Sequence, residues 1–336
     1  MDFRSLEKVD SEKMYKIYDN WPKIAQESYK FEHEQIEFKN IKHIVFAGMG
    51  GSGSIGDVFS SILSKSKIHV NVVKGYHLPK TVNSDTLVIA ISVSGNTVET
   101  ISVLQNAKKM KCNIIAFSSG GKIQEICKKN EIHYRNIPLI HSPRASFTSY
   151  LYTILKILHN TLQIDKSEIL ESIKELEKLA KIISSSNLTK SNTAINLAEW
   201  ISDVPVIYYP FGLESAAIRF KNSLQENAKM HIFTEDVIEA CHNGIVSWER
   251  KSNIKPILIE GQDDHIKTKE RWIILKEFFN QNKIECKEVM SNSGGILSKI
   301  INLIYFLDYT TIYKSVIDEI DPSPVLSIKF VKSKLK

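Results

Sequence analysis

The sequence predicts an α/β protein of two lobes, each with a mainly parallel sheet flanked by helices. Short β-branched runs alternate with helical stretches, and glycine or serine bounds most of the runs. This alternation is interrupted by a serine-rich stretch near the middle of the chain and then restarts. A chain of 336 residues is long enough for two such lobes.

The first lobe is predicted to open with a strand over His43–Ala47 and a helix over Gly53–Ser64, followed by four further strands and three further helices. The remaining predicted strands are His69–Val73, Thr86–Ile91, Asn113–Phe117 and Ile132–Ile137. The remaining predicted helices are Thr97–Met110, Lys122–Lys129 and Ser146–Leu162. In such a lobe the loops that follow the strands share the carboxyl edge of the sheet, where these folds bind ligands.

The second lobe follows a charged amphipathic helix over Lys166–Ser184 and the serine run that ends at Asn187. Its predicted strands are Val204–Tyr209, Ile254–Ile259 and Lys283–Val289. Its predicted helices are Ala194–Ser202, Leu213–Lys229, Lys267–Asn280 and Ser298–Ile317. We therefore expect a helical extension over residues 1–40, a first domain over 41–165, a helical linker over 166–187 and a second domain with a C-terminal helix over 188–336.

Composition excludes several classes of protein. The net charge of +6 is spread along the chain, with basic residues interleaved with acidic ones, so no nucleic-acid partner is expected. No apolar run approaches the ~20 residues of a membrane span, and the first 35 residues lack the apolar core of a signal peptide. The four cysteines form no C-x-x-C pair and lie at no zinc-ligand spacing. We expect reduced thiols, no metal and a cytoplasmic location.

A glycine-rich loop follows the first strand, and its candidate ligand-binding residues are Gly50, Gly51 and Ser52. Glycines allow the backbone to approach a ligand closely, and the N–H groups of the next helix favour an anion. The spacing of Gly48, Gly50 and Gly53 also fits a dinucleotide fingerprint. That interpretation requires an acid after the second strand, where the chain has Lys74-Gly75-Tyr76 instead. A purely structural turn is the other alternative.

A second loop, after the strand Thr86–Ile91, carries three hydroxyls around a Gly-Asn turn: Ser92, Ser94 and Thr97. Small hydroxyl side chains and bare N–H groups at a helix start form a compact phosphate site. Helix capping would explain one hydroxyl but not three. The sequence therefore predicts phosphate binding here.

Three further polar residues carry little information when considered singly. Arg144 follows a proline at the start of a long helix and could face an anion or be an ordinary surface arginine. Glu226 ends a helix in Gln-Glu-Asn-Ala-Lys and could be a solvated carboxylate. His242 lies in Cys-His-Asn-Gly and could be a capping or surface histidine.

The ordered set of these segments resembles the SIS (sugar isomerase) fold, and specifically the archaeal type of bifunctional phosphoglucose/phosphomannose isomerase. The matching segments are Gly48–Gly53, Ser92–Thr100, Pro143–Ala145, Glu226–Lys229, His242–Gly244 and Asp321–Val325. The resemblance implies two three-layer SIS domains without a cofactor. It implies an enzyme of carbohydrate metabolism (glycolysis and gluconeogenesis) that interconverts glucose 6-phosphate, and mannose 6-phosphate, with fructose 6-phosphate through ring opening and a cis-enediol.

The resemblance also implies roles for the candidate residues. Ser92, Ser94 and Thr97 would hold the phosphate, and Glu226 would move the proton between C1 and C2. Arg144 would stabilise the enediolate. His242, borrowed from the partner chain of a homodimer, would assist ring opening together with a C-terminal lysine. Among Lys329, Lys332, Lys334 and Lys336 we choose Lys332, because its helical row with Val325, Ile328 and Leu335 predicts an inward-facing side chain.

The chain departs from the usual family pattern at two positions. Gln225 stands where a smaller polar residue is expected, and Val93 stands where an aromatic is common; both could alter the sugar preference. Two other functions remain open. One is a non-catalytic sugar-phosphate sensor on the same fold, which would need the phosphate loop but not Glu226, His242 and a lysine together. The other is a different SIS enzyme, such as an aminosugar-phosphate deaminase or a heptose-phosphate isomerase.

Overall fold

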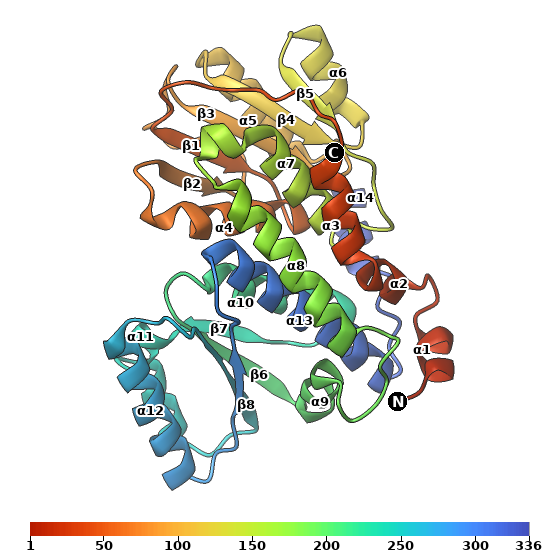
Figure 1. Cartoon of the computed structure of the whole chain (residues 1–336), viewed down its shortest axis with the longest axis vertical. Coiled ribbons are helices and arrows are strands. Elements are labelled where there is room, and N and C mark those ends of the chain that lie inside the picture. The colour runs from red at the N-terminus through yellow and green to blue at the C-terminus, as the bar shows by residue number, and fades with distance from the viewer. Residues whose placement is uncertain (336) are drawn as a thin grey trace. The chain divides into compact units, whose positions relative to one another are not determined.

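The computed structural model describes residues 1–335 as two compact units, drawn together in Figure 1. The five-stranded unit comprises Asn20–Leu176 and Gly294–Ile301. The four-stranded unit comprises Met1–Asp19, Glu177–Ser293 and Asn302–Lys336. Each unit contains one wholly parallel sheet with helices, so the predicted α/β class is confirmed.

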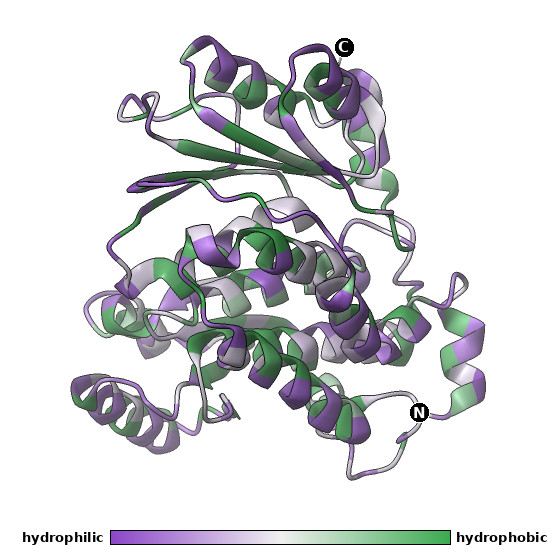
Figure 2. Ribbon diagram, turned by 45° about the horizontal axis from the view of Figure 1, so that its top comes forward, coloured by the Kyte–Doolittle hydropathy of each residue, from purple (hydrophilic) through white to green (hydrophobic). Residues whose placement is uncertain are grey.

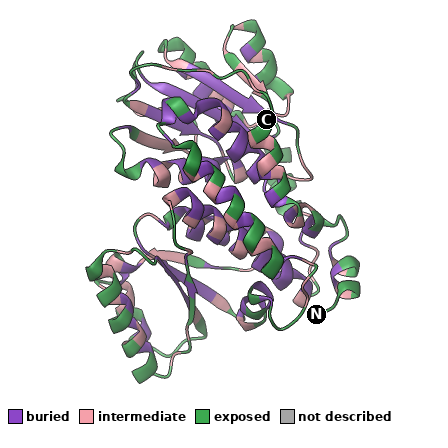
Figure 3. Cartoon of the chain, in the orientation of Figure 1, coloured by how far each residue is buried: buried purple, intermediate pink, exposed green. Residues whose placement is uncertain are grey.

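The sheet of the five-stranded unit has the order β2-β1-β3-β4-β5, and every neighbouring pair is parallel. Its strands are β1 (His43–Ala47), β2 (His69–Val73), β3 (Leu87–Ser92), β4 (Asn113–Ser118) and β5 (His133–Asn136). Its helices are α3 (Trp21–Lys30), α4 (Gly51–Ile62), the 3-10 turn η1 (Leu63–Lys65), α5 (Val98–Lys109), α6 (Gly121–Lys129) and α7 (Phe147–Leu162). The central strand β3 is buried along its whole length, as Figure 3 shows.

The core of this unit explains why its strands could be predicted. One face of the sheet packs Val45, Val88 and Ala116 against Leu104 of α5 and Ile123 of α6. Parallel strands covered on both faces are apolar at nearly every position. Figure 2 shows strand ribbons of this sheet that are largely green, with purple stretches at polar strand positions. Helix α3 of the predicted extension belongs to this unit.

The sheet of the four-stranded unit has the order β7-β6-β8-β9, again wholly parallel. Its strands are β6 (Val204–Tyr209), β7 (Phe233–Asp236), β8 (Ile254–Glu260) and β9 (Lys287–Met290). Its helical segments are α1 (Phe3–Val9), α2 (Met14–Asp19), α9 (Thr193–Trp200), α10 (Glu214–Asn227), α11 (Val237–Ala240), η2 (Gly244–Glu249), α12 (Ile266–Gln281) and α14 (Leu326–Lys334). Strand β7 was not predicted, because Phe-Thr-Glu-Asp is short, charged and nowhere fully buried.

Two long helices, α8 (Lys166–Ile183) and α13 (Ile296–Ile317), contribute residues to both units. The predicted domain boundaries stay predictions, but the serine run proposed as linker is anchored within the four-stranded unit. The backbone N–H of Ser185 donates to Asp19 Oδ1 at 2.9 Å, and its hydroxyl donates to Asp19 Oδ2 at 2.6 Å. Among residues 1–335, no helix has both the length and the apolar composition needed to cross a bilayer.

Candidate functional site

The first glycine loop connects β1 to α4 in the five-stranded unit. Gly50 takes a φ of +54°, and α4 begins at the next residue. A Cβ on Gly51 would lie 3.1 Å from the carbonyl oxygen of Pro143 and 3.3 Å from the N of Arg144, so a side chain there would crowd this segment. Glycine at this position therefore lets the glycine loop and the Arg144 segment pack backbone against backbone.

The predicted phosphate loop, Ser92–Thr97, lies beside this glycine loop because β1 and β3 are neighbours in the sheet. The hydroxyl of Ser52, itself buried, accepts a hydrogen bond from the backbone N–H of Val93 at 3.2 Å. Ser52 thus ties the two loops together. The expectation that both loops share the carboxyl edge of one sheet is confirmed.

The three hydroxyls of the phosphate loop differ in their surroundings. Ser92 is buried, and its Oγ lies 2.8 Å from Thr97 Oγ1. Ser94 is exposed, and its hydroxyl accepts from the N–H of Asn96 at 3.3 Å. Thr97 occupies the N-cap of α5 but makes no side-chain capping hydrogen bond. Capping is therefore not the use of this hydroxyl, and the N-terminal N–H groups of α5 remain available to an anion.

A third loop, Ser118–Gly121 after β4, was missed by sequence reasoning although it shows the same signal of serines and glycines after a buried strand. Ser119 donates through its hydroxyl to the carbonyl of Val93 at 2.6 Å. Gly95 has a φ of +67°, and a Cβ there would collide with the carbonyl oxygen of Gly120. The third loop therefore fixes the shape of the phosphate loop.

Arg144 precedes α7 and is only 4% exposed, which excludes the interpretation of an ordinary surface arginine. Its segment is held by Ser146, whose hydroxyl donates to the carbonyl of Ser142 at 2.9 Å and accepts from the N–H of Ile140 at 2.9 Å. A buried arginine packed against a glycine loop suits the stabilisation of an anion.

Glu226 lies in the last turn of α10 in the four-stranded unit and is half-buried. Lys229 follows with a φ of +57°, and its ammonium donates to the carbonyl of Glu226 at 2.5 Å and to that of Pro322 at 3.4 Å. Asn227 donates to Thr311 Oγ1 of α13 at 2.7 Å. These contacts fix the backbone on which the Glu226 carboxylate is carried.

His242 lies in an exposed turn after α11. Its N–H donates to the carbonyl of Glu239 at 2.9 Å, and the Asn243 amide donates to Glu239 Oε1 at 2.6 Å. A Cβ on Gly244 would lie 2.5 Å from Glu235 Oε2. Burial raises the pKa of Glu235, and the charges of Glu239 and Asp236 raise it further. The turn is thus hydrogen-bonded to Glu239 and packed against Glu235.

The topology keeps Glu226 and His242 of one chain apart. Helix α10 starts at the carboxyl edge of its sheet after β6 and packs on β6 and β7, so its last turn lies at the amino edge, before β7 begins. His242 follows β7 and α11, at the carboxyl edge. Helix α10 has 14 residues, which corresponds to a length of about 20 Å. A single chain therefore does not bring these two groups to one point of this unit.

Lys332 is exposed, and α14 contains no buried residue. The prediction that it faces inward among apolar neighbours is wrong for the single chain. In the row predicted to face inward, Ile328 is 40% exposed and Leu335 is 51% exposed. The other apolar side chains nearby, Leu326, Phe330 and Val331, are each more than half exposed. A nine-residue helix is marginal in water without a packed face. Lys336 lies outside the described residues.

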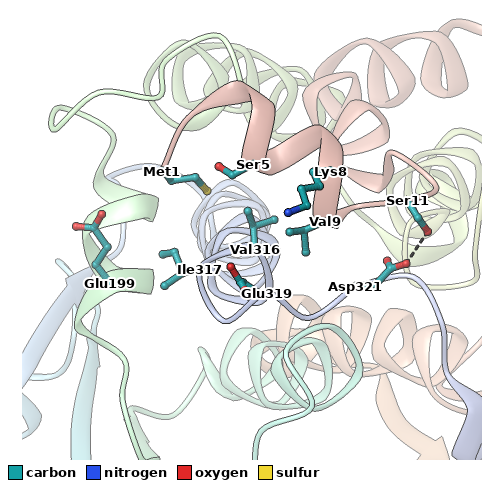
Figure 4. A pocket seen from close by; sticks show the side chains of 10 residues that line it. All are labelled: Met1, Ser5, Lys8, Val9, Ser11, Glu199, Val316, Ile317, Glu319 and Asp321. Carbon is teal, nitrogen blue, oxygen red and sulfur yellow. Dashed lines mark hydrogen bonds between the residues drawn. The ribbon is translucent and has the colours of Figure 1, made fainter.

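One of the described cavities has a volume of about 730 Å³ and belongs to the four-stranded unit. Figure 4 shows it between α1 and the end of α13, lined by Ser5, Lys8, Glu199 and Glu319 among others. None of the predicted site residues lines it. Over residues 1–335 no group of three His, Cys, Asp or Glu side chains is placed to hold a metal ion.

Comparison with known proteins identifies the family. Residues 37–157 match the SIS domain, and residues 190–335 match the bacterial phospho-glucose isomerase C-terminal SIS domain. The chain is 31% identical over 337 residues to a bifunctional phosphoglucose/phosphomannose isomerase of Caldicellulosiruptor bescii, covering 96% of this chain and 98% of that relative. The chain belongs to the bifunctional phosphoglucose/phosphomannose isomerase family.

One further relative and one solved structure are also similar to this chain. A relative of the same description from Aquifex aeolicus is 27% identical over 332 residues, covering 97% of this chain and 99% of the relative. The C-terminal domain of glucosamine-fructose-6-phosphate aminotransferase from Francisella tularensis superposes with a TM-score of 0.70 at 14% identity, covering 93% of this chain and 97% of that one. At that identity the superposition supports the SIS fold alone.

Proposed function

We propose that this protein interconverts glucose 6-phosphate, and also mannose 6-phosphate, with fructose 6-phosphate. The observation that carries this proposal is the phosphate loop, where Thr97 stands at a helix start without capping it and Ser92 and Ser94 flank it. Membership of the bifunctional isomerase family supports the choice of substrate.

The proposed chemistry assigns one step to each group. A proton leaves the C1 hydroxyl and another reaches the ring oxygen, so the sugar ring opens with the help of His242 and Lys332. Glu226 then removes a carbon-bound proton and returns it to the neighbouring carbon. The intermediate is an enediolate, whose negative charge Arg144 stabilises. Rotation about C2–C3 of the enediol would allow the same base to serve both sugars.

We propose further that the active protein is a homodimer in which His242 comes from the partner chain. The positions of Glu226 and His242 at opposite edges of one sheet support this arrangement. The uncovered apolar side chains of α14 also favour an assembly that covers them. A cytoplasmic location fits an enzyme of carbohydrate metabolism in which Cys112, Cys127, Cys241 and Cys286 are all free thiols.

A non-catalytic sensor is less well supported, because binding a phosphosugar gives no reason to hold the Glu226 carboxylate on a fixed helix end. The direct test is a coupled assay that starts from fructose 6-phosphate and detects glucose 6-phosphate and, separately, mannose 6-phosphate. We expect turnover to both products. Binding of fructose 6-phosphate without turnover would support the sensor, and release of ammonia from glucosamine 6-phosphate would indicate a deaminase.

A further inference from the structure

A buried ion pair joins α10 to α13 inside the four-stranded unit. Arg219 is 2% exposed and Asp308 is fully buried. Arg219 Nε and NH2 donate to Asp308 Oδ2 at 3.0 and 2.7 Å. The pair links positions 89 residues apart in the sequence.

The Asp308 carboxylate is surrounded by donors on several elements. Ser223 of α10 donates to Oδ1 at 2.6 Å, and Tyr18 of α2 donates to Oδ2 at 3.3 Å. Burial alone would lower the pKa of Arg219, but the Asp308 charge outweighs it and the pKa is raised. The Arg219 guanidinium is therefore charged, and the Asp308 carboxylate accepts hydrogen bonds from three different side chains.

The same helix face carries Glu226. Arg219, Ser223, Glu226 and Asn227 stand at positions i, i+4, i+7 and i+8 of α10, which share one side of an α-helix. Asp308 of α13 accepts hydrogen bonds from Arg219 and Ser223. Thr311, one turn further along α13, accepts a hydrogen bond from Asn227. Glu226 is thus placed between two polar contacts that fix both the rotation and the axial position of α10 against α13.

Stability does not explain this arrangement. A buried ion pair is often no more stabilising than apolar side chains of similar volume, because desolvation offsets the attraction. Apolar side chains would pack α10 on α13 without fixing its rotation, whereas a forked guanidinium accepted by one carboxylate fixes direction. The ion pair therefore fixes the rotation of α10 relative to α13.

We propose that the Arg219–Asp308 pair, with Ser223, is a positioning device that sets where the Glu226 carboxylate stands for proton transfer. The inference rests on the proposed function of Glu226. Arg219 and Asp308 are positioning residues and do not touch the substrate. The cost of losing them falls on turnover, since an error of about 1 Å in a reacting group can reduce the rate on the order of 100-fold.

The test replaces the pair with apolar side chains in the full-length protein, as Arg219→Met with Asp308→Leu. We expect kcat to fall on the order of 100-fold while KM stays within about twofold. Amide hydrogen exchange over residues 223–228 should accelerate about tenfold or more. Arg219→Lys, which keeps the charge and loses the fork, provides a second variant with a smaller loss of about tenfold in kcat.

Thr310→Val is the matched control, because Thr310 is equally buried on α13 and its hydroxyl donates only to Phe306 of the same helix, at 2.9 Å. Its kcat should stay within about twofold of wild type. Wild-type kcat or unchanged exchange in either folded pair variant would overturn the inference, as would a raised KM at constant kcat. An inactive wild-type protein would instead contradict the proposed function, and the exchange measurement would still decide whether the pair holds α10.

Discussion

The two candidate halves of the site are built differently. In the five-stranded unit, backbone N–H groups and hydroxyls lie in three loops that cross-link one another, and Gly95 and Gly51 leave no space for a side chain. In the four-stranded unit, Glu226 stands on the end of a helix fixed from α13, and His242 stands in an exposed turn. Binding a phosphate needs many fixed weak donors, whereas proton transfer needs a few well-aimed side chains.

The largest expected effect on activity tests the half of the site in the four-stranded unit. Glu226→Gln keeps the shape of the side chain and removes the base, so kcat should fall ~10³-fold or more. KM for fructose 6-phosphate should stay within about threefold, because the phosphate loop is untouched. Steady-state kinetics measures both. Glu214→Gln, at the exposed start of the same helix, is the control and should leave kcat unchanged.

The next effect, on stability, tests how tightly the loops of the five-stranded unit are packed. Gly95→Ala would place a methyl group against the carbonyl of Gly120 in a backbone region that L-residues rarely adopt. We expect a loss of about 3 kcal/mol or more in the free energy of unfolding, measured in urea. Gly75→Ala, where nothing lies within 4 Å of the new methyl, should change stability by less than about 0.5 kcal/mol. Equal losses at both positions would mean that the loop is not tightly packed.

A smaller effect separates binding from chemistry. Thr97→Val removes one hydroxyl from the phosphate loop, and a hydrogen bond to a charged group contributes about 1.5–3 kcal/mol, so KM should rise about 10- to 100-fold. The value of kcat should stay within about threefold.

Thr100→Val is the matched control for this variant. The Thr100 hydroxyl is buried and has no hydrogen-bond partner among the described residues. Its replacement should leave KM unchanged and stabilise the protein by about 1 kcal/mol, because an unsatisfied buried hydroxyl is removed. A rise in KM for this control equal to that for Thr97→Val would show that the loop responds to any change on α5.

The smallest effect concerns the acidic support of the His242 turn. Because the pKa of Glu235 is raised in the folded state, the native protein binds this proton more tightly than the unfolded chain does. The contribution to stability is fully present below the unfolded pKa and is lost as pH rises through the folded pKa. Glu235→Gln should therefore raise the Tm at pH 7 and not at pH 4. The corresponding gain in the free energy of unfolding is only a few tenths of a kcal/mol, because solvent screens this partly exposed group.

Glu285, a carboxylate whose pKa is shifted in the opposite direction, provides the control for Glu235→Gln. The pKa of Glu285 is lowered by the hydrogen bond from Trp200 and by Lys255, although desolvation opposes them. Glu285→Gln should reduce the Tm at pH 7. The difference from wild type should disappear at acidic pH, where the Glu285 carboxyl is protonated in both the folded and the unfolded state. The same sign for both variants would contradict the account of these groups.

Sequence reasoning worked where local pattern and burial agree. The apolar run His43–Ala47 is buried on both faces, and β1 begins and ends at the predicted residues. The hydroxyl loop after β3 was found because its signal lies within six residues. Strand β7 was missed because its pairing to β6, and not its composition, makes it a strand.

Features that depend on contacts between residues far apart in the chain could not be predicted from the sequence. The periodicity of Val325–Leu335 correctly predicts a helix, but periodicity does not state which neighbour covers it, so Lys332 was wrongly placed inside. Arg219 and Asp308 were not singled out, since nothing near either residue indicates a partner on another helix. The burial of Arg144 likewise follows from tertiary packing against Gly51.

We propose that the five-stranded unit binds the phosphate while the four-stranded unit moves the proton. The most direct test follows deuterium from D2O into C2 of glucose 6-phosphate, formed from fructose 6-phosphate by wild type and by Glu226→Gln, with calorimetric binding of fructose 6-phosphate by both. With wild type we expect deuterium at C2 in part of the product, because the proton held by Glu226 can exchange with solvent before it is returned. We expect near-complete loss of that incorporation in the variant, and equal binding by the two proteins. Incorporation by the variant within about tenfold of wild type, a barrier difference of only ~1.4 kcal/mol, would contradict this proposal.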